Sequence, residues 1–244
     1  MSKKIVVMDS GIGGASILKE IRELLPAYSY LYFADTKNAP YGNKTKAQVL
    51  EIVVKNVLKI NKKNEILALV LACNTASSAC SKSLRKMFNF PIICVEPPIK
   101  KAIDLKYKNI LILATEGTLK TNLTIKKYTN SNQAKIQKFA PKNLAKLIDR
   151  NVENLNLVIP YLKKELENKK CDCAVLGCTH YNFLKNKIKA ILKCPVITCE
   201  KAVARQTKKV LDELKISAQK PKLKIKLSKQ NFKIRRFLKT YLNS

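Results

Sequence analysis

Two cysteines occupy matching places in the chain, each directly after an apolar run. Cys73 follows the run at 66–72, and Cys178 follows the run at 173–177. Helical sequence comes after each, and the N-terminus of a helix favours a thiolate because its unpaired N–H groups carry partial positive charge. Either cysteine alone could equally be a buried packing residue. Their matching positions favour acid/base chemistry for both.

The sequence around these two cysteines recurs. Val70–Thr75 reads VLACNT and Val175–His180 reads VLGCTH, about half a chain apart. Two related halves that face each other would place one thiol on each side of a bound molecule. Racemisation at an α-carbon needs that arrangement, because one group removes the proton from one face and a second group delivers a proton to the other. The repeat therefore predicts a racemase with Cys73 and Cys178 as opposed acid/base groups.

Further polar residues follow the same predicted strands. In open parallel sheets, functional groups gather just beyond the carboxyl ends of the strands. Asp9 and His180, the single histidine of the chain, could exchange protons with the two thiols, and Asp9 could instead orient an ammonium group. We assign both as catalytic helpers. The other candidates at strand ends are Ser10, Asp35, Tyr41, Gly42, Asn74, Thr75 and Thr179.

The segment Asp9–Gly14 reads DSGIGG and lies between a predicted strand and a predicted helix. It is similar to a phosphate-binding loop, but it lacks the third spaced glycine of the dinucleotide fingerprint and any Gly-Lys-Ser/Thr. A glycine turn that exposes backbone N–H groups suits a carboxylate equally well. A nucleotide site is therefore the weaker interpretation.

A group of metal-binding residue types suggests zinc as an alternative. It consists of Cys171, Cys173, Cys178 and His180. Its C-x-C-x4-C-x-H spacing lacks the usual knuckle of structural zinc sites, and 173–177 has the composition of a buried strand. We therefore predict no metal site. The remaining cysteines are interpreted as packing residues: Cys80, Cys94, Cys194 and Cys199.

Short apolar runs alternate with amphipathic segments, which is typical of parallel sheets covered by helices on both faces. The predicted strands are 5–8, 30–34, 66–72, 91–95, 109–114, 135–139, 173–177 and 195–198. A first predicted helix begins near residue 15, a second covers 45–60, and a third follows the strand at 66–72 and ends near residue 88. The helices predicted after these cover 119–128, 144–148, 152–167 and 183–192. Pro160 is expected to kink or split the helix at 152–167. The tail predicts an edge strand at 222–227, followed by a helical stripe of Ile234, Phe237, Leu238 and Tyr241.

The bulk composition bounds the class of protein. The chain carries 48 Lys and Arg against 17 Asp and Glu, a net charge of +31, with lysine spread over most segments. Such a charge favours weak, salt-sensitive adsorption to nucleic acid, and a nonenzymatic nucleic-acid-binding protein is the third-ranked hypothesis. No apolar run reaches the roughly 20 residues that span a bilayer, and the start does not read as a secretory signal. We expect a cytoplasmic protein with free thiols and no membrane or specific nucleic-acid partner.

Four segments resemble the glutamate racemase family, within the aspartate/glutamate racemases. They are Asp9–Gly14, Ala34–Asp35 with Pro40–Gly42, Ala72–Ser77 and Leu176–Tyr181. The resemblance implies an isomerase that interconverts L- and D-glutamate without pyridoxal phosphate or metal and supplies D-glutamate for peptidoglycan. It implies an α/β fold of two doubly wound, pseudo-symmetric parallel-sheet domains with the active site between them. We place the first domain, with Cys73, at 1–97 plus about 205–244, and the second, with Cys178, at 98–204.

The resemblance also implies roles for individual residues. Cys73 is the base for D-glutamate and Cys178 the base for L-glutamate, with Asp9 and His180 as their helpers. The implied substrate ligands are Asp9, Ser10, Tyr41, Gly42, Asn74, Thr75, Thr179 and His180, with Thr115 and Thr118 matching a pair that holds a carboxylate. The partner is then a small molecule, glutamate, no cofactor is needed, and a homodimer is compatible with the family.

The chain departs from the family at three places. An acidic helper is expected within 140–149, where the candidate is the short side chain of Asp149. The later Asp-Ser-Gly-like segment appears as Thr198–Glu200 without its glycine, and the C-terminal region matches only loosely. These departures leave catalytic rate, regulation and oligomer geometry open. A related racemase of another acidic amino acid, such as aspartate, is the alternative.

Overall fold

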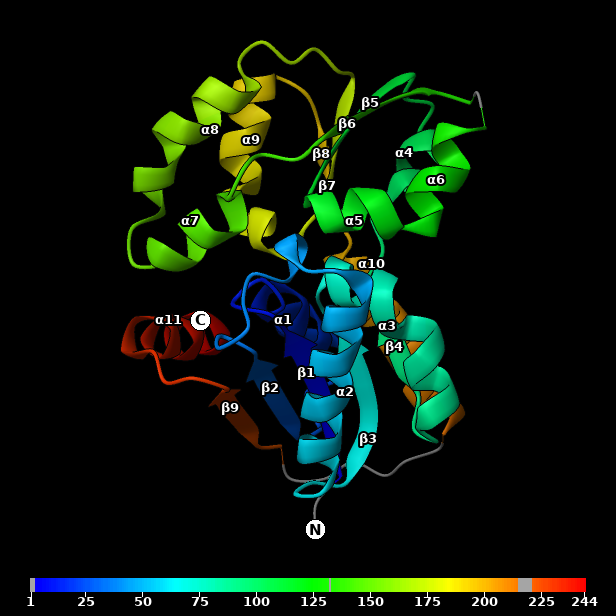
Figure 1. Ribbon diagram of the computed structural model, residues 1–244, viewed down its shortest axis with the longest axis vertical. Coiled ribbons are helices and arrows are strands. Elements are labelled where there is room, and N and C mark those ends of the chain that lie inside the picture. Colours follow the sequence, from blue (N-terminus) through cyan, green and yellow to red (C-terminus); the bar gives the residue numbers. More distant parts are fainter. Residues whose placement is uncertain (1–2, 132, 215–220) are drawn as a thin grey trace.

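The computed structural model describes residues 3–131, 133–214 and 221–244, and its strands form two parallel sheets (Figure 1). The first sheet has the order β4-β3-β1-β2-β9, and the second has the order β6-β5-β7-β8. The bounds of the first are β1 Lys4–Asp9, β2 Tyr30–Ala34, β3 Ile66–Leu71, β4 Ile92–Cys94 and β9 Leu223–Leu227. Those of the second are β5 Asn109–Ala114, β6 Lys135–Phe139, β7 Cys173–Gly177 and β8 Val196–Ile197. All these strand pairs are parallel, so the predicted fold class is confirmed.

Helices flank each sheet, as Figure 1 shows with the first sheet below and the second above. Around the first sheet lie α1 Ala15–Leu24, α2 Lys46–Asn61, α3 Asn74–Met87, α10 Glu200–Glu213 and α11 Phe232–Asn243. Around the second lie α4 Ile99–Asp104, α5 Glu116–Thr121, α6 Leu123–Thr129, α7 Leu144–Arg150, α8 Ile159–Leu166 and α9 Lys185–Leu192. Shorter 3-10 helices cover Tyr41–Asn43, Leu155–Val158 and Thr179–Leu184.

The apolar strands of the first sheet contribute side chains to two separate hydrophobic cores, one on each face of the sheet. Alternate residues of β1 point to opposite faces, as strand geometry requires. Ile5 and Val7 join the core beneath α1, whereas Val6 and Met8 join the core beneath α2 and α3. All six residues of β3 are buried. Burial on both faces explains why these strands read as continuous apolar runs instead of alternating ones.

Three predicted helices differ from the observed ones. The helix expected at 119–128 is divided into α5 and α6, because the Asn122 side chain caps α6 by accepting from the Ile125 N–H. The helix expected at 152–167 begins only at Ile159, with Pro160 in the first turn, where its missing N–H costs nothing. The helix expected at 183–192 is preceded by a 3-10 turn and begins at Lys185.

The tail closes the first sheet. β9 pairs with β2 and forms its edge, and α11 buries Ile234 and Leu238 against the core shared with α1. The predicted edge strand and helix are therefore both observed. α10 returns from the second sheet and packs against α1. Within the described ranges, we find no helix that is both long and apolar enough to cross a membrane.

Candidate active site

The two matching cysteines open on a single cavity between the two sheets. Cys73 lies between β3 and α3 as the N-cap of that helix, and Cys178 takes the same position between β7 and the 3-10 helix Thr179–Leu184. Each residue is 7% exposed, and both line the cavity. The cavity is lined by both cysteines together with Ser10, Tyr41, Gly42, Asn74, Thr75, Thr115, Thr118, Asp149, Thr179 and His180, among others. The structure thus brings together residues from both halves of the chain.

The Cys73 thiol is held in a buried, partly negative environment. Its Sγ lies 3.7 Å from the Ser10 hydroxyl oxygen. Burial raises the pKa of Cys73 to about 11, the negative charge of Asp9 adds to this rise, and the Ala76 N–H at the start of α3 opposes it. The helix N-terminus lowers this pKa as expected, but burial outweighs it, so the net shift is upward.

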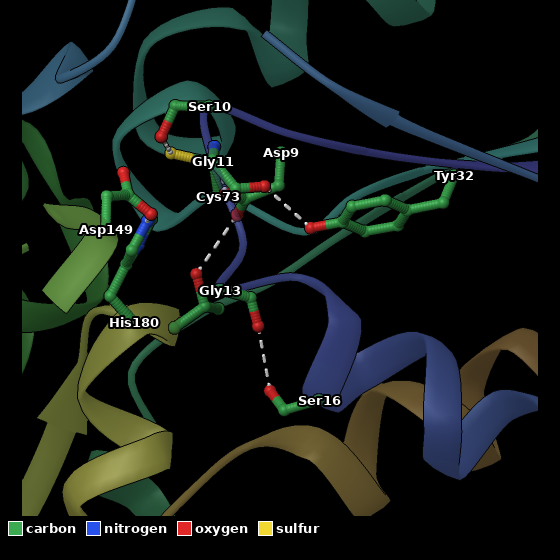
Figure 2. A network of polar contacts seen from close by, with 10 residues as sticks. Asp9, Ser10, Gly11, Gly13, Ser16, Tyr32, Cys73, Asp149 and His180 are labelled. Atoms are coloured by element: carbon green, nitrogen blue, oxygen red, sulfur yellow. Dashed lines mark hydrogen bonds and ion pairs between the residues drawn. The ribbon is translucent and has the colours of Figure 1, made fainter. Parts of the chain in front are cut away.

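Asp9 is buried outside the cavity lining, and its polar contacts, drawn in Figure 2, connect the two halves of the molecule. One carboxylate oxygen accepts from the Gly11 N–H at 2.6 Å, and the other accepts from the Thr179 hydroxyl at 3.1 Å. Burial raises the pKa of Asp9, although His180, Gly11 and Thr179 favour its charged form. Asp9 can therefore exchange a proton closer to neutral pH than an exposed carboxyl group does.

His180 is paired with Asp149 on the Cys178 side of the cavity. Its Nε2 lies 3.2 Å from Asp149 Oδ1, and the two side chains meet in Figure 2. Burial alone lowers the pKa of His180, but Asp149, the Cys178 thiol and Asp9 raise it well above its usual range. These neighbours therefore favour the protonated imidazole, which can donate a hydrogen bond to the Cys178 sulfur.

Small polar groups line the rest of the cavity. The Thr75, Thr115 and Thr118 hydroxyls lie 3.0–3.2 Å from one another, with Thr75 on α3 and the other two at the start of α5. Both amide atoms of Asn74 are buried without a hydrogen-bond partner within the described structure. Buried polar atoms normally have partners. These groups therefore suit a polar ligand such as a carboxylate or an ammonium group.

Asp35 contacts the cavity indirectly, through the side chain of Tyr41. It is fully buried and accepts hydrogen bonds from the Tyr41 hydroxyl at 2.6 Å and from the Asn38 and Asn56 amides at 2.9–3.0 Å. This network fixes the side chain of Tyr41, which lines the cavity. Asp35 stands at a strand end as predicted, and it acts on the cavity through Tyr41.

Tyr32 is a site-supporting residue that the sequence did not reveal. Its side chain is fully buried, and its hydroxyl donates to the Gly11 carbonyl at 2.8 Å, within the turn that holds Asp9 (Figure 2). The same turn needs glycine at position 13, because a Cβ there would lie 2.5 Å from the Thr179 hydroxyl oxygen. The turn is therefore clamped between β2 and the second half of the molecule.

The four residues considered for zinc do not converge. Cys173 begins β7, whereas Cys178 and His180 follow its carboxyl end. Among residues 3–131, 133–214 and 221–244, no group of three or more His, Cys, Asp or Glu side chains is arranged to hold a metal ion. Cys80, Cys94, Cys194 and Cys199 are absent from the cavity lining.

Known proteins with similar sequences and structures are amino-acid racemases. The family model of Asp/Glu/hydantoin racemases matches residues 5–207. The glutamate racemase of Clostridium acetobutylicum is 39% identical over 245 residues, which cover 94% of this chain and 93% of that protein. A crystal structure of Escherichia coli glutamate racemase with L-glutamate and the activator UDP-MurNAc-ala has a TM-score of 0.86 at 28% identity, covering 99% of this chain and 96% of the other. A Bacillus anthracis glutamate racemase structure has a TM-score of 0.85 at 27% identity, covering 99% and 94%.

Proposed function

The chain belongs to the Asp/Glu/hydantoin racemase family, and we propose that it interconverts L-glutamate and D-glutamate with Cys73 and Cys178 as opposed acid/base groups. The reaction is that of an isomerase, and its product D-glutamate is used for peptidoglycan. The observation that supports the thiol pair most strongly is that both cysteines, from different halves of the chain, line one cavity.

The proposed reaction moves a single proton at a time. Starting from L-glutamate, the Cys178 thiolate removes the α-proton from one face of the substrate, and the Cys73 thiol delivers its proton to the opposite face. This leaves D-glutamate, a Cys178 thiol and a Cys73 thiolate. After D-glutamate leaves, Cys178 gives up a proton to solvent and Cys73 takes one up, which restores the starting state for the next L-glutamate. The high pKa of Cys73, about 11, keeps it protonated at neutral pH and ready to act as the acid.

The neighbouring groups prepare the two thiols for opposite roles. Protonated His180, held by Asp149, stabilises the negative charge on Cys178. Asp9 lies on the Cys73 side, where it can accept the proton that Cys73 must release before it acts as a base for D-glutamate. Asp149 thus supplies the acidic group that the family pattern calls for, through His180.

The polar lining is assigned to the substrate. We propose that Asn74 and the hydroxyls of Thr75, Thr115 and Thr118 bind a carboxylate, because hydroxyl and amide donors converge there and Asn74 has no partner of its own within the described residues. The remaining proposed ligands are Ser10, Tyr41, Gly42, Thr179 and His180 on the cavity wall, with Asp9 behind it. Direct proton transfer between substrate and thiols requires no cofactor.

Chiral chromatography of glutamate after incubation with purified protein tests this proposal. We expect wild-type protein to convert either enantiomer to an equal mixture, and Cys73→Ala and Cys178→Ala to lose this activity. Cys171→Ala is the matched control, because Cys171 lies before β7, at the end remote from Cys178. Racemisation at wild-type rate in either active-site variant would exclude that thiol, and a preference for aspartate in a substrate panel would contradict the glutamate assignment.

Three further features belong to the same proposal. We place the domain division at 1–97 with about 205–244 and at 98–204, so that each thiol belongs to a different domain. A homodimer and a cytoplasmic location accord with the proposed role. Sedimentation at several concentrations and cell fractionation test these two features.

A further inference from the structure

Two cysteines outside the cavity lie close together. Cys171 Sγ and Cys194 Sγ are 3.5 Å apart, and both thiols are free. Cys171 stands just before β7, and Cys194 stands between α9 and β8. β7 and β8 are parallel neighbours in which Ala174 pairs with Val196, so the two cysteines lie at the amino ends of adjacent strands. Their proximity is therefore fixed by the sheet.

This pair is remote from the proposed reaction. Cys178 follows the carboxyl end of β7, which has five residues. At about 3.3 Å per residue, the strand separates Cys171 from Cys178 by roughly 16 Å or more. Neither Cys171 nor Cys194 lines the cavity that holds Cys73 and Cys178. A role for this pair is thus independent of the proposed racemisation.

The pair can be reached from solvent through Cys171, whereas Cys194 is buried at the floor of a hollow. Cys171 is partly exposed, and Cys194 lines a surface hollow together with Lys189, Lys193 and Pro195. The two lysines make the hollow attractive to carboxylates. Glutathione disulfide is a small disulfide that carries several carboxylates, so its chemistry fits this surface.

We propose that Cys171 and Cys194 form a reversible disulfide by exchange with a low-molecular-weight disulfide of the glutathione type. Cys171 loses its proton to solvent and attacks one sulfur of glutathione disulfide, which breaks that S–S bond and releases one glutathione thiolate. Cys194 then loses its proton and attacks the Cys171 sulfur, which forms the protein disulfide and releases the second glutathione. Two electrons pass from the two protein sulfurs to the reagent, and the two protons end on the two glutathiones.

The local chemistry sets the rate and the stability of this bond. The two sulfur atoms must approach from 3.5 Å to about 2.05 Å, a movement that side-chain rotation of partly exposed Cys171 can supply. Burial and the neighbouring Cys194 raise the pKa of Cys171 to about 12. Exchange is therefore slow at neutral pH and faster in alkaline solution. Because Cys171 is protonated at neutral pH, the reduced protein is not stabilised by a thiolate, and this favours the disulfide.

The expected consequence is a covalent tie across the second sheet. The bond closes the loop from Cys171 to Cys194, which contains β7, α9 and the Cys178–His180 segment. Closing a loop reduces the conformational freedom of the unfolded chain. We therefore expect the oxidised protein to melt several degrees higher, with unchanged racemisation, because the tie lies at the far end of β7.

Equilibration in glutathione redox buffers at about pH 8.5, followed by acid quenching and alkylation, tests the proposal. Free-thiol titration should show that wild-type protein falls from eight thiols to six. Trypsin should release residues 171–185 linked to residues 194–201, and tandem mass spectrometry should place the bond between Cys171 and Cys194. Cys173→Ser is the matched control that retains the bond, whereas Cys171→Ser and Cys194→Ser abolish it.

Each alternative outcome overturns the proposal. Eight remaining thiols after equilibration with excess glutathione disulfide would show that the pair does not close. Cross-linked peptides that persist in Cys171→Ser would place the bond elsewhere. A melting temperature that does not rise on oxidation, or racemase activity that falls in step with cross-linking and recovers on reduction, would show that the bond distorts the sheet.

Discussion

Replacing Asp149 by Asn removes one charge from the proposed site and leaves its shape nearly intact. Asp149 Oδ1 lies 3.2 Å from His180 Nε2, and the two side chains are only 18% and 5% exposed. Asp149 is the strongest of the influences that raise the pKa of His180 against the opposing effect of burial. In the variant, the pKa of His180 therefore falls, and His180 holds the proton that stabilises the Cys178 thiolate less firmly.

The size of the effect follows from the geometry. Two unit charges 3.2 Å apart attract by about 5 kcal/mol at an effective dielectric constant near 20, which is an upper bound for a pair beside an open cavity. Hydrogen bonds to charged groups contribute about 1.5–3 kcal/mol net. At about 1.4 kcal/mol for each factor of ten, we expect kcat/KM to fall roughly ten- to hundredfold. Because the two enantiomers have equal free energies, kcat/KM must fall by the same factor in both directions.

Circular dichroism of glutamate, followed from each enantiomer, measures this change. The variant should recover relative to wild type as pH is lowered toward about 6, because acid restores the proton that His180 has lost. Asp104→Asn, which removes an exposed carboxylate on α4, is the charge-matched control. Wild-type activity in Asp149→Asn, or a deficit that does not shrink in acid, would refute the proposed role of the pair.

Three other perturbations test the supporting structure. Tyr32→Phe leaves the buried Gly11 carbonyl without its donor, so it should cost about 1–3 kcal/mol of stability and lower kcat with little change in KM. Tyr30→Phe is the control, because the Tyr30 hydroxyl also donates to a carbonyl, and it should lower stability alone. Denaturant titrations measure the stability of both variants, and steady-state assays measure kcat and KM. Gly13→Ala places a Cβ 2.5 Å from Thr179 Oγ1 and should lower the free energy of unfolding by about 1–3 kcal/mol, so an unchanged melting curve would contradict the close approach. Since burial raises the pKa of Cys73 to about 11 and one thiol of the pair must stay protonated, kcat/KM should fall equally from both enantiomers only as pH approaches about 11, and a fall near pH 9, the ordinary pKa of a thiol, would contradict that environment.

The fold could be predicted largely because its signals are local. The runs at β1, β3 and β7 are apolar at consecutive positions, which only strands buried on both faces require. The alternating residues of β9 likewise identified an edge strand. The helix starts were less predictable, because they depend on single caps such as Asn122, which divides one amphipathic segment into α5 and α6.

The site residues that directly follow strand ends could be predicted from the sequence. Contacts between residues that are far apart in the sequence could not. Cys73 and Cys178 could be identified from their positions after apolar runs, but the meeting of Asp149 with His180 joins separate elements. Tyr32 sits within an apolar strand, where nothing distinguishes a hydrogen-bonding tyrosine from a packing one. The raised pKa of Cys73 depends on burial by the whole fold, which a helix N-terminus in the sequence does not reveal.

The origin of the proton in the product tests the two-thiol reaction most directly. Protiated L-glutamate is incubated with the enzyme in deuterium oxide, and mass spectrometry of the separated enantiomers follows the first few per cent of reaction. Two opposed thiols predict that the newly formed D-glutamate carries deuterium at its α-carbon while the remaining L-glutamate stays protiated. D-glutamate that retains the original proton would mean that one group serves both faces, and it would contradict the assignment of Cys73 and Cys178 as a pair.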